Sequence, residues 1–185
     1  ANPKEPDDYD DDIVNYRGGI KYQINDALAI RTSAGTAYYP GLSTWFFKNV
    51  TTPPSLVEAN PNLDPEETWM VDLGLDGNFV KTGTSFSITA YYGRIKDIIA
   101  GRYDSVPGHP TWTVLRYSNV GEAEIYGLET QFNQRLTEHL SAVLSLTLNH
   151  SEIVDDPVNE GNQVSTAPDY MFNVGLKYLN PGLIN

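Results

Sequence analysis

Apolar and polar residues alternate along most of this 185-residue chain. The clearest instance begins at Leu140, where leucine or alanine occupies every second position through Leu148 and mostly polar residues lie between them. Because successive side chains of a β-strand point to opposite faces, this period predicts a long strand with one apolar and one polar face. The stretch from Tyr117 to Thr137 alternates in the same way, interrupted only by small residues, and predicts another long strand.

The pattern as a whole predicts an all-β chain with about seven long antiparallel strands. These are expected at residues 13–23, 28–33, 68–79, 85–99, 117–137, 140–149 and 170–178. Short connections alternate strictly with long loops along the chain. The short connections lie at 24–27, 77–84 and 136–139, and the long loops at 37–66, 101–110 and 155–168. This alternation puts all the long loops at one end of the sheet, as in outer-membrane β-barrels.

The polar face of the predicted sheet carries charged side chains. They are Arg17, Lys21, Arg31, Asp72, Asp76, Glu129 and Lys177. A dry core does not tolerate such charges, so the apolar face must meet lipid or partner protein and the polar face must meet water or a plug. The cations either face a plug or an anionic ligand path, or pair with the acidic residues. Tyr170 and Tyr178 bracket an apolar band of about 25 Å, close to the spacing of an aromatic girdle. We therefore predict an arc of a large transmembrane β-barrel.

Charge and composition exclude several classes of binding partner and structural feature. The chain has 24 acidic and 12 basic residues, a formal charge of −12, which argues against nucleic acid because phosphate binding requires the opposite sign. Cysteine is absent, which excludes disulfides and cysteine-ligated metals. No apolar run approaches the roughly 18 residues of a membrane helix. No signal peptide is present, so we expect the sequence to start inside a longer precursor.

Residues 1–12 form an acidic segment that is typical of a solvated loop. Calcium binding is the alternative, because hard cations prefer carboxylate oxygens. The carboxylates concerned are Asp7, Asp8, Asp10, Asp11 and Asp12. We expect no cofactor and no other metal.

No catalytic constellation stands out, and the chain is predicted not to be an enzyme. Asn149, His150 and Ser151 suggest the triad of a barrel-borne lipase, because a hydroxyl nucleophile needs an adjacent, oriented base. Adjacent strand residues point to opposite faces, however, so a histidine near the membrane interface fits the alternation better. His109 lies in a Pro-Gly-His-Pro turn, without a second ligand at metal-binding spacing.

Three segments, taken together, carry a resemblance to a known family. Residues 17–23 (RGGIKYQ) and 28–31 (LAIR) lead into 34–43 (AGTAYYPGLS), residues 60–68 read NPNLDPEET, and residues 118–129 read SNVGEAEIYGLE. In this order and spacing they resemble a strand pair and the segments NPNLKPE and NVGKARIYGLE of the TonB-dependent outer-membrane receptors. The resemblance extends over about residues 13–179.

The resemblance implies a location in the bacterial outer membrane and a barrel of about 22 strands filled by a plug domain. Residues 13–179 are then a partial barrel from the C-terminal half, residues 1–12 an acidic loop and residues 180–185 a truncated end. The implied partners are the plug domain and remaining barrel strands, the TonB energy-coupling protein acting through the missing N-terminal part, and membrane lipid. We expect the isolated sheet to pair its edges with neighbouring copies or to curl around its apolar face.

The implied function is energy-coupled uptake of a scarce ligand, foremost a ferric siderophore or other iron complex, with cobalamin and a glycan also open. A soluble all-β ligand-binding or interaction module is the alternative. Aromatic residues of the long loops are the candidate ligand contacts, because an external ligand arrives at that end. They are Tyr38, Tyr39, Trp45, Phe46, Tyr103 and Trp112. The alternative is that these rings form an interface girdle or pack the loops.

Overall fold

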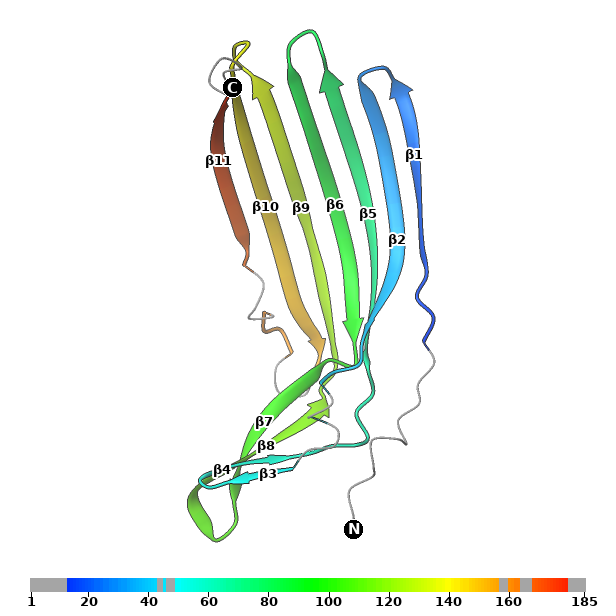
Figure 1. The fold of residues 1–185 in the computed structure, drawn as a ribbon. Coiled ribbons are helices and arrows are strands. Elements are labelled where there is room, and N and C mark those ends of the chain that lie inside the picture. The colour runs from blue at the N-terminus through cyan, green and yellow to red at the C-terminus, as the bar shows by residue number, and fades with distance from the viewer. Residues whose placement is uncertain (1–12, 43–44, 46–48, 157–159, 164–167, 180–185) are drawn as a thin grey trace, which may run out of the picture.

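The computed structural model describes residues 13–42, 45, 49–156, 160–163 and 168–179. These residues form two β-sheets, a tall wall and a smaller sheet joined to one end of it (Figure 1). Within the described ranges, no helix has the length and apolar character needed to cross a membrane.

The wall is a seven-stranded antiparallel sheet, which confirms the predicted fold class. Short turns lie at one end of the wall and the long connections at the other, as predicted (Figure 1). In spatial order the strands are β1 (Arg17–Asn25), β2 (Leu28–Tyr39), β5 (Glu66–Phe79), β6 (Thr84–Lys96), β9 (Glu122–Arg135), β10 (Leu140–Asp155) and β11 (Tyr170–Tyr178).

Two of the long connections form a second sheet, which we call the external sheet. In spatial order it contains β3 (Val50–Thr52), β4 (Ser55–Glu58), β8 (His109–Asn119) and β7 (Ile99–Val106). The prediction of loops at 37–66 and 101–110 is therefore wrong. β4 pairs in parallel with β8, which lies more than 50 residues further along the chain, from Ser55 beside Thr113 to Glu58 beside Arg116. Such short strands are held by distant pairing partners and leave little periodic signal of their own.

The predicted strand at 117–137 is two strands, because β8 ends at Asn119 and β9 begins at Glu122. The break falls at Gly121, whose φ of 126° is rarely adopted by residues with a side chain. A Cβ on Gly121 would lie 1.4 Å from the carbonyl oxygen of Asp155, so the backbone of β10 fills that space. At this corner the chain passes from the external sheet into the wall (Figure 1).

Strand register gathers the apolar side chains of the wall on one face. A single row across it contains Ile20, Thr32, Leu73, Ala90, Leu128, Leu148 and Tyr170. The face is open: Ile20 is 73% exposed and Leu73 55% exposed. Of the two alternatives for the isolated sheet, curling around this face is contradicted, because each wall strand pairs only with its neighbours and the sheet stays spread. Pairing of its edges with neighbouring copies stays a prediction. An exposed apolar band of this kind fits contact with lipid.

Aromatic rings lie toward both ends of the apolar face. Near the external sheet, Trp69 and Tyr92 lie with ring centroids 5.4 Å apart, and Tyr126 and His150 with centroids 4.9 Å apart. Toward the short turns, Phe79 and Phe86 stack at 6.2 Å. Aromatic residues at both borders of an apolar band are typical of membrane-spanning barrels. His150 shares this face, as the alternation predicts.

The opposite, polar face carries a cross-strand charge network. Arg31 on β2 lies between two carboxylates of β5, with N–O distances of 3.4 Å to both Asp72 and Asp76. Lys21 on β1 reaches Asp76 at 3.0 Å, and Arg31 also donates a hydrogen bond to Thr89 Oγ1 at 2.5 Å. Of the two alternatives for the cations, pairing with acidic residues therefore applies to Lys21 and Arg31. The network ties four adjacent strands together on the face that is turned away from the apolar band.

Candidate functional site

The end of the wall that carries the external sheet is the candidate functional site. A small core forms there from Leu63, which is 3% exposed, and Ile99, which is 9% exposed. Trp45 and Tyr117 pack against this core. Because the core joins the β2–β5 connection to both strands of the β7–β8 hairpin, it fixes the external sheet as one unit.

Aromatic rings extend from this core. The rings of Trp45 and Tyr117 stack with centroids 4.5 Å apart, and Tyr39 meets Trp45 edge-on at 6.3 Å. Two of the predicted ligand contacts, Tyr39 and Trp45, are thus brought together. Tyr117, the stacking partner of Trp45, was absent from the predicted set, because its stretch was interpreted as part of a wall strand.

Hydrogen bonds connect the segments 60–68 and 118–129, which the sequence marked as motifs. The backbone N–H of Asp64 donates to Oδ1 of Asn119 at 2.9 Å, and Nδ2 of Asn119 donates to the carbonyl oxygens of Asp64 and Asp97, both at 2.7 Å. Asn60 donates from Nδ2 to the carbonyl of Tyr117 at 2.9 Å. These side chains thereby supply partners to backbone groups that the irregular chain path leaves unpaired, of which the Tyr117 carbonyl is partly buried. We call Asn60, Asp64 and Asn119 the asparagine clasp.

The other predicted contacts lie apart from this cluster. Register places Tyr38 opposite Glu67, on the same face of the wall as the apolar band, whereas Tyr39 is on the polar face. Tyr103 on β7 is 69% exposed. Trp112 on β8 stacks with His109 at 4.2 Å near the tip of the hairpin. Phe46 lies outside the described residues.

An ion-pair ladder crosses the external sheet. Arg116 on β8 lies 2.7 Å from Glu58 on β4 and 3.2 Å from Asp104 on β7. Arg102 lies 3.2 Å from Asp104. The hydrogen bond to Glu58, together with the charges of both carboxylates, raises the pKa of Arg116 above its ordinary value. Arg116 therefore carries its positive charge at physiological pH. Its contacts with Glu58 and Asp104 link the two connections.

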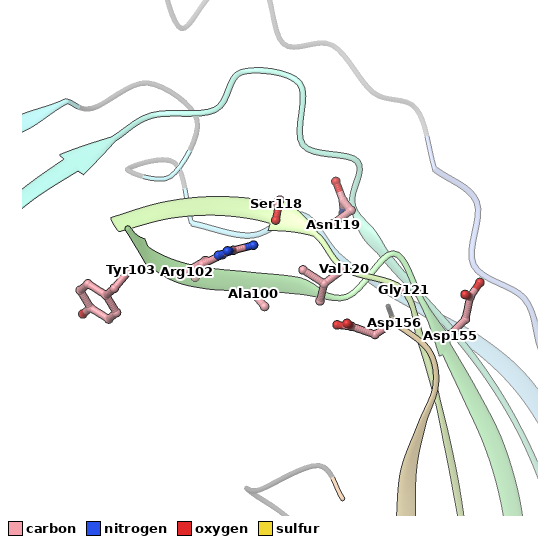
Figure 2. A pocket seen from close by; sticks show the side chains of 10 residues that line it. Ala100, Arg102, Tyr103, Ser118, Asn119, Val120, Gly121, Asp155 and Asp156 are labelled. Carbon is pink, nitrogen blue, oxygen red and sulfur yellow. The ribbon is translucent and has the colours of Figure 1, made fainter. Parts of the chain in front are cut away.

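A hollow of about 870 Å³ opens between the β7–β8 hairpin and the end of β10 (Figure 2). Its lining includes Arg102, Tyr103, Ser118, Asp155 and Asp156. This volume is within the range of small-molecule sites, about 300–1,000 Å³. Of the six predicted contacts, Tyr103 lines the hollow.

The described residues do not form the arrangement that a catalytic or a metal-binding site would need. His150 lies 3.6 Å from Glu152 and faces the apolar side, while Ser151 is buried and paired with Ile125 in the sheet. Among the described residues, no group of three histidine, aspartate or glutamate side chains is placed to hold a metal ion. The acidic run Asp7–Asp12 lies outside the described residues, so calcium binding there stays an untested alternative.

Residues 2–184 match the family described as "TonB dependent receptor-like, beta-barrel". The chain belongs to the TonB-dependent receptors. This family membership confirms the resemblance that the three segments indicated and places the chain in the bacterial outer membrane. Its relatives are receptors and transporters, which agrees with the prediction that the chain is not an enzyme.

Individual relatives resemble this chain of the TonB-dependent receptor family at low sequence identity. An iron-regulated outer membrane virulence protein of Vibrio cholerae is 27% identical over 135 residues, which are 70% of this chain and 20% of that protein. The siderophore receptor PirA from Pseudomonas aeruginosa superposes with a TM-score of 0.70 at 18% identity, covering 89% of this chain and 30% of that one. The copper transporter OprC superposes with a TM-score of 0.67 at 21% identity, covering 88% and 23%. The chain therefore spans about a quarter of the length of these relatives.

In a TonB-dependent receptor barrel, the apolar face of the wall contacts lipid and the polar face lines the lumen. The Lys21–Asp76 and Arg31–Asp72 pairs are then luminal. The external sheet lies at the end with long connections, which in outer-membrane barrels is the extracellular end. The hollow and the aromatic cluster therefore lie at this end of the wall.

Proposed function

We propose that this chain is a segment of an outer-membrane receptor that takes up an iron complex, with a ferric siderophore as the foremost cargo. The external sheet is the observation that carries the proposal, because it presents a hollow and exposed aromatic rings beside a polar luminal wall. The iron-regulated relative from Vibrio cholerae and the siderophore receptor PirA support iron rather than cobalamin or a glycan.

The six aromatic residues take different roles in this proposal. Tyr103 contacts the cargo, because its ring is exposed and lines the hollow. Tyr39 and Trp45 hold the loop that frames the site, because each is engaged with another ring. Trp112 contributes at the hairpin tip. Tyr38 contacts lipid headgroups, since it shares the face of the apolar band. Phe46 is proposed as a contact on its sequence position alone.

The partners follow from the barrel geometry. The open edges of β1 and β11, each with one neighbour, pair with the remaining strands of the full-length receptor. The polar face with Arg31 and Asp76 meets the plug domain across the lumen. The TonB protein supplies energy through a part of the receptor outside this chain. Lipid covers the apolar face.

Uptake measurements test the proposal. Cells that lack their other iron receptors, and that carry the full-length receptor, should accumulate radiolabelled iron from a siderophore complex only when TonB is present. The Tyr103→Ala variant should lower uptake, while Tyr103→Phe should preserve it if the ring itself makes the contact. Uptake of labelled cobalamin or of a glycan, without uptake of iron, would contradict the proposal.

Cell fractionation tests the alternative, a soluble ligand-binding module. The full-length protein should be found in the outer membrane and should require detergent for extraction, because the apolar face of the wall is exposed. A monomer recovered from the periplasm without detergent would favour the module.

A further inference from the structure

We propose that this sector of the external surface selects a neutral or cationic iron complex and disfavours polyanionic complexes. The inference rests on the proposed function and specifies the charge class of the cargo at the same site. It is carried by the charge balance of the external connections, the pairing of their cations and the lining of the hollow.

Acidic residues outnumber basic residues in the connections at the external end. Segments 40–65, 97–121 and 156–169, which lie between wall strands, contain seven acidic and three basic residues. The acidic residues are Glu58, Asp64, Asp97, Asp104, Asp156, Glu160 and Asp169, and the basic ones are Lys48, Arg102 and Arg116. The summed field at this end is therefore negative, which raises the local concentration of cations and lowers that of anions.

The two described arginines of these connections are already engaged with carboxylates. Arg116 is held between Glu58 and Asp104, and Arg102 is paired with Asp104. Recognition of an anionic complex uses arginine or lysine groups that are aimed at the ligand. Arg102 is the cation that lines the hollow, and its Nε atom lies 3.2 Å from Asp104. Its charge is thus balanced within the external sheet.

The lining of the hollow contains more acidic than basic residues. Against Arg102, its lining contains Asp155 and Asp156 at the end of β10. Figure 2 shows the Asp156 carboxylate directed to the side of Ala100 and Val120, and Asp155 directed away from them. A cationic or neutral complex enters such a site without repulsion, while each added negative charge on the cargo is penalised. Tyr103 supplies an aromatic face that a cation also favours.

The test uses the full-length receptor in the outer membrane and three labelled ferric complexes. They are a trihydroxamate that carries an added ammonium group, a neutral trihydroxamate and a trianionic tris-catecholate. The Kd of each complex is measured on cells at low ionic strength and again at high salt. We expect the trianion to bind about 10-fold or more weakly than the cation at low ionic strength, with the gap narrowing in salt.

Charge variants locate the effect. The double variant Asp155→Lys/Glu160→Lys should bring the trianion and the cation closer in Kd by about 10-fold. Glu138→Lys, which makes one such acid-to-lysine change in the exposed turn at the opposite end of the wall, should leave the preference unchanged. Arg102→Gln should preserve or strengthen binding of the cationic complex.

The outcomes separate this inference from the proposed function. Tighter binding of the trianion by the unmodified receptor, or loss of all binding in Arg102→Gln, would overturn the charge selection while leaving iron uptake in place. Failure to bind or take up any of the three complexes would overturn the proposed function and this inference with it.

Discussion

Asn119 and Asp64 exchange two hydrogen bonds: the backbone N–H of Asp64 donates to Oδ1 of Asn119, and Nδ2 of Asn119 donates to the carbonyl oxygen of Asp64. Their chain positions differ by 55 residues, and each belongs to a different connection of the wall. The same amide group also reaches the carbonyl of Asp97, where β6 gives way to β7. One side chain therefore satisfies three backbone groups at the base of the external sheet.

Replacing Asn119 should destabilise the external sheet locally without unfolding the wall. Asn119→Ala removes three hydrogen bonds, each worth about 1 kcal/mol, and leaves their backbone partners without this side chain. We expect faster amide hydrogen exchange in β7 and β8 and earlier proteolysis there, with unchanged exchange in β9 and β10. Asn119→Asp keeps only the acceptor oxygen, so its exchange rates in β7 and β8 should lie between those of the unmodified receptor and those of Asn119→Ala. Equal loosening of β10 would contradict a role confined to the clasp.

Gly121 should tolerate no side chain. A Cβ there would lie 1.4 Å from the Asp155 carbonyl oxygen, a distance that requires the corner between β9 and β10 to open. Gly121→Ala should therefore lower the yield of folded receptor, measured by heat-modifiable migration on gels. Gly108→Ala is the matched control, because Gly108 has a φ of 81° but no atom within 4 Å of its Cβ position. It should cost about 1 kcal/mol from backbone strain and still assemble.

The wall was predictable from sequence because its strands repeat one simple rule. Leu140 to Leu148 alternate over enough positions to identify both faces, and the register then confirms which residues share each face. Charges such as Asp72 and Asp76 on the polar face further distinguished a water-lined wall from a sandwich core. The family segments strengthened this interpretation by fixing the order of strands.

The external sheet was not predictable by the same rule. β3 and β4 contain three and four residues, which is too few for a periodic signal, and β4 is paired with β8 by distant contacts. The asparagine clasp also leaves no periodic trace, because it joins side chains to irregular backbone. Tyr117 was missed for a related reason. The alternation of its stretch continues across the corner at Gly121, whereas the strand itself ends at Asn119. Proximity of two motifs in space cannot be inferred from their separation in the chain.

Arg31 should contribute more to the stability of the wall than Lys21. Arg31 contacts Asp72, Asp76 and Thr89 with a side chain that is 33% exposed, whereas Lys21 makes one ion pair and is 58% exposed. Arg31→Gln should lower the free energy of unfolding by about 1–2 kcal/mol, after allowance for solvent screening, and Lys21→Gln by less than about 1. Urea titration of the receptor in detergent measures both. A larger effect for Lys21 would count against the network.

The parallel pairing of β4 with β8 should be captured by a disulfide. The chain contains no cysteine, so an introduced pair is unambiguous. Val57→Cys/Leu115→Cys places the two thiols at paired positions, at a strand separation of about 4.8 Å that suits a disulfide. Val57→Cys/Thr113→Cys is offset along the strand and should cross-link poorly. Similar rates for the two pairs would mean that this register is not fixed.

The two faces of β10 should respond differently to one new charge. Leu146 shares the apolar face, and Ser145, its neighbour, lies on the polar face. Leu146→Arg exposes a cation to lipid and should cost about 2–4 kcal/mol near the membrane midplane, whereas Ser145→Arg should cost far less. The measurement is the fraction of receptor folded into vesicles across a urea series. Tolerance of arginine at Leu146 would contradict lipid contact there.

The joining of β4 to β8 restricts how the receptor's external end can change during evolution. An insertion or deletion in one connection would shift its strand against the other, and would also move Glu58 away from Arg116. The two connections are therefore expected to be inherited and recombined as a pair. A chimera that borrows the β2–β5 connection from a related receptor should fold its external end only if the β7–β8 hairpin comes with it.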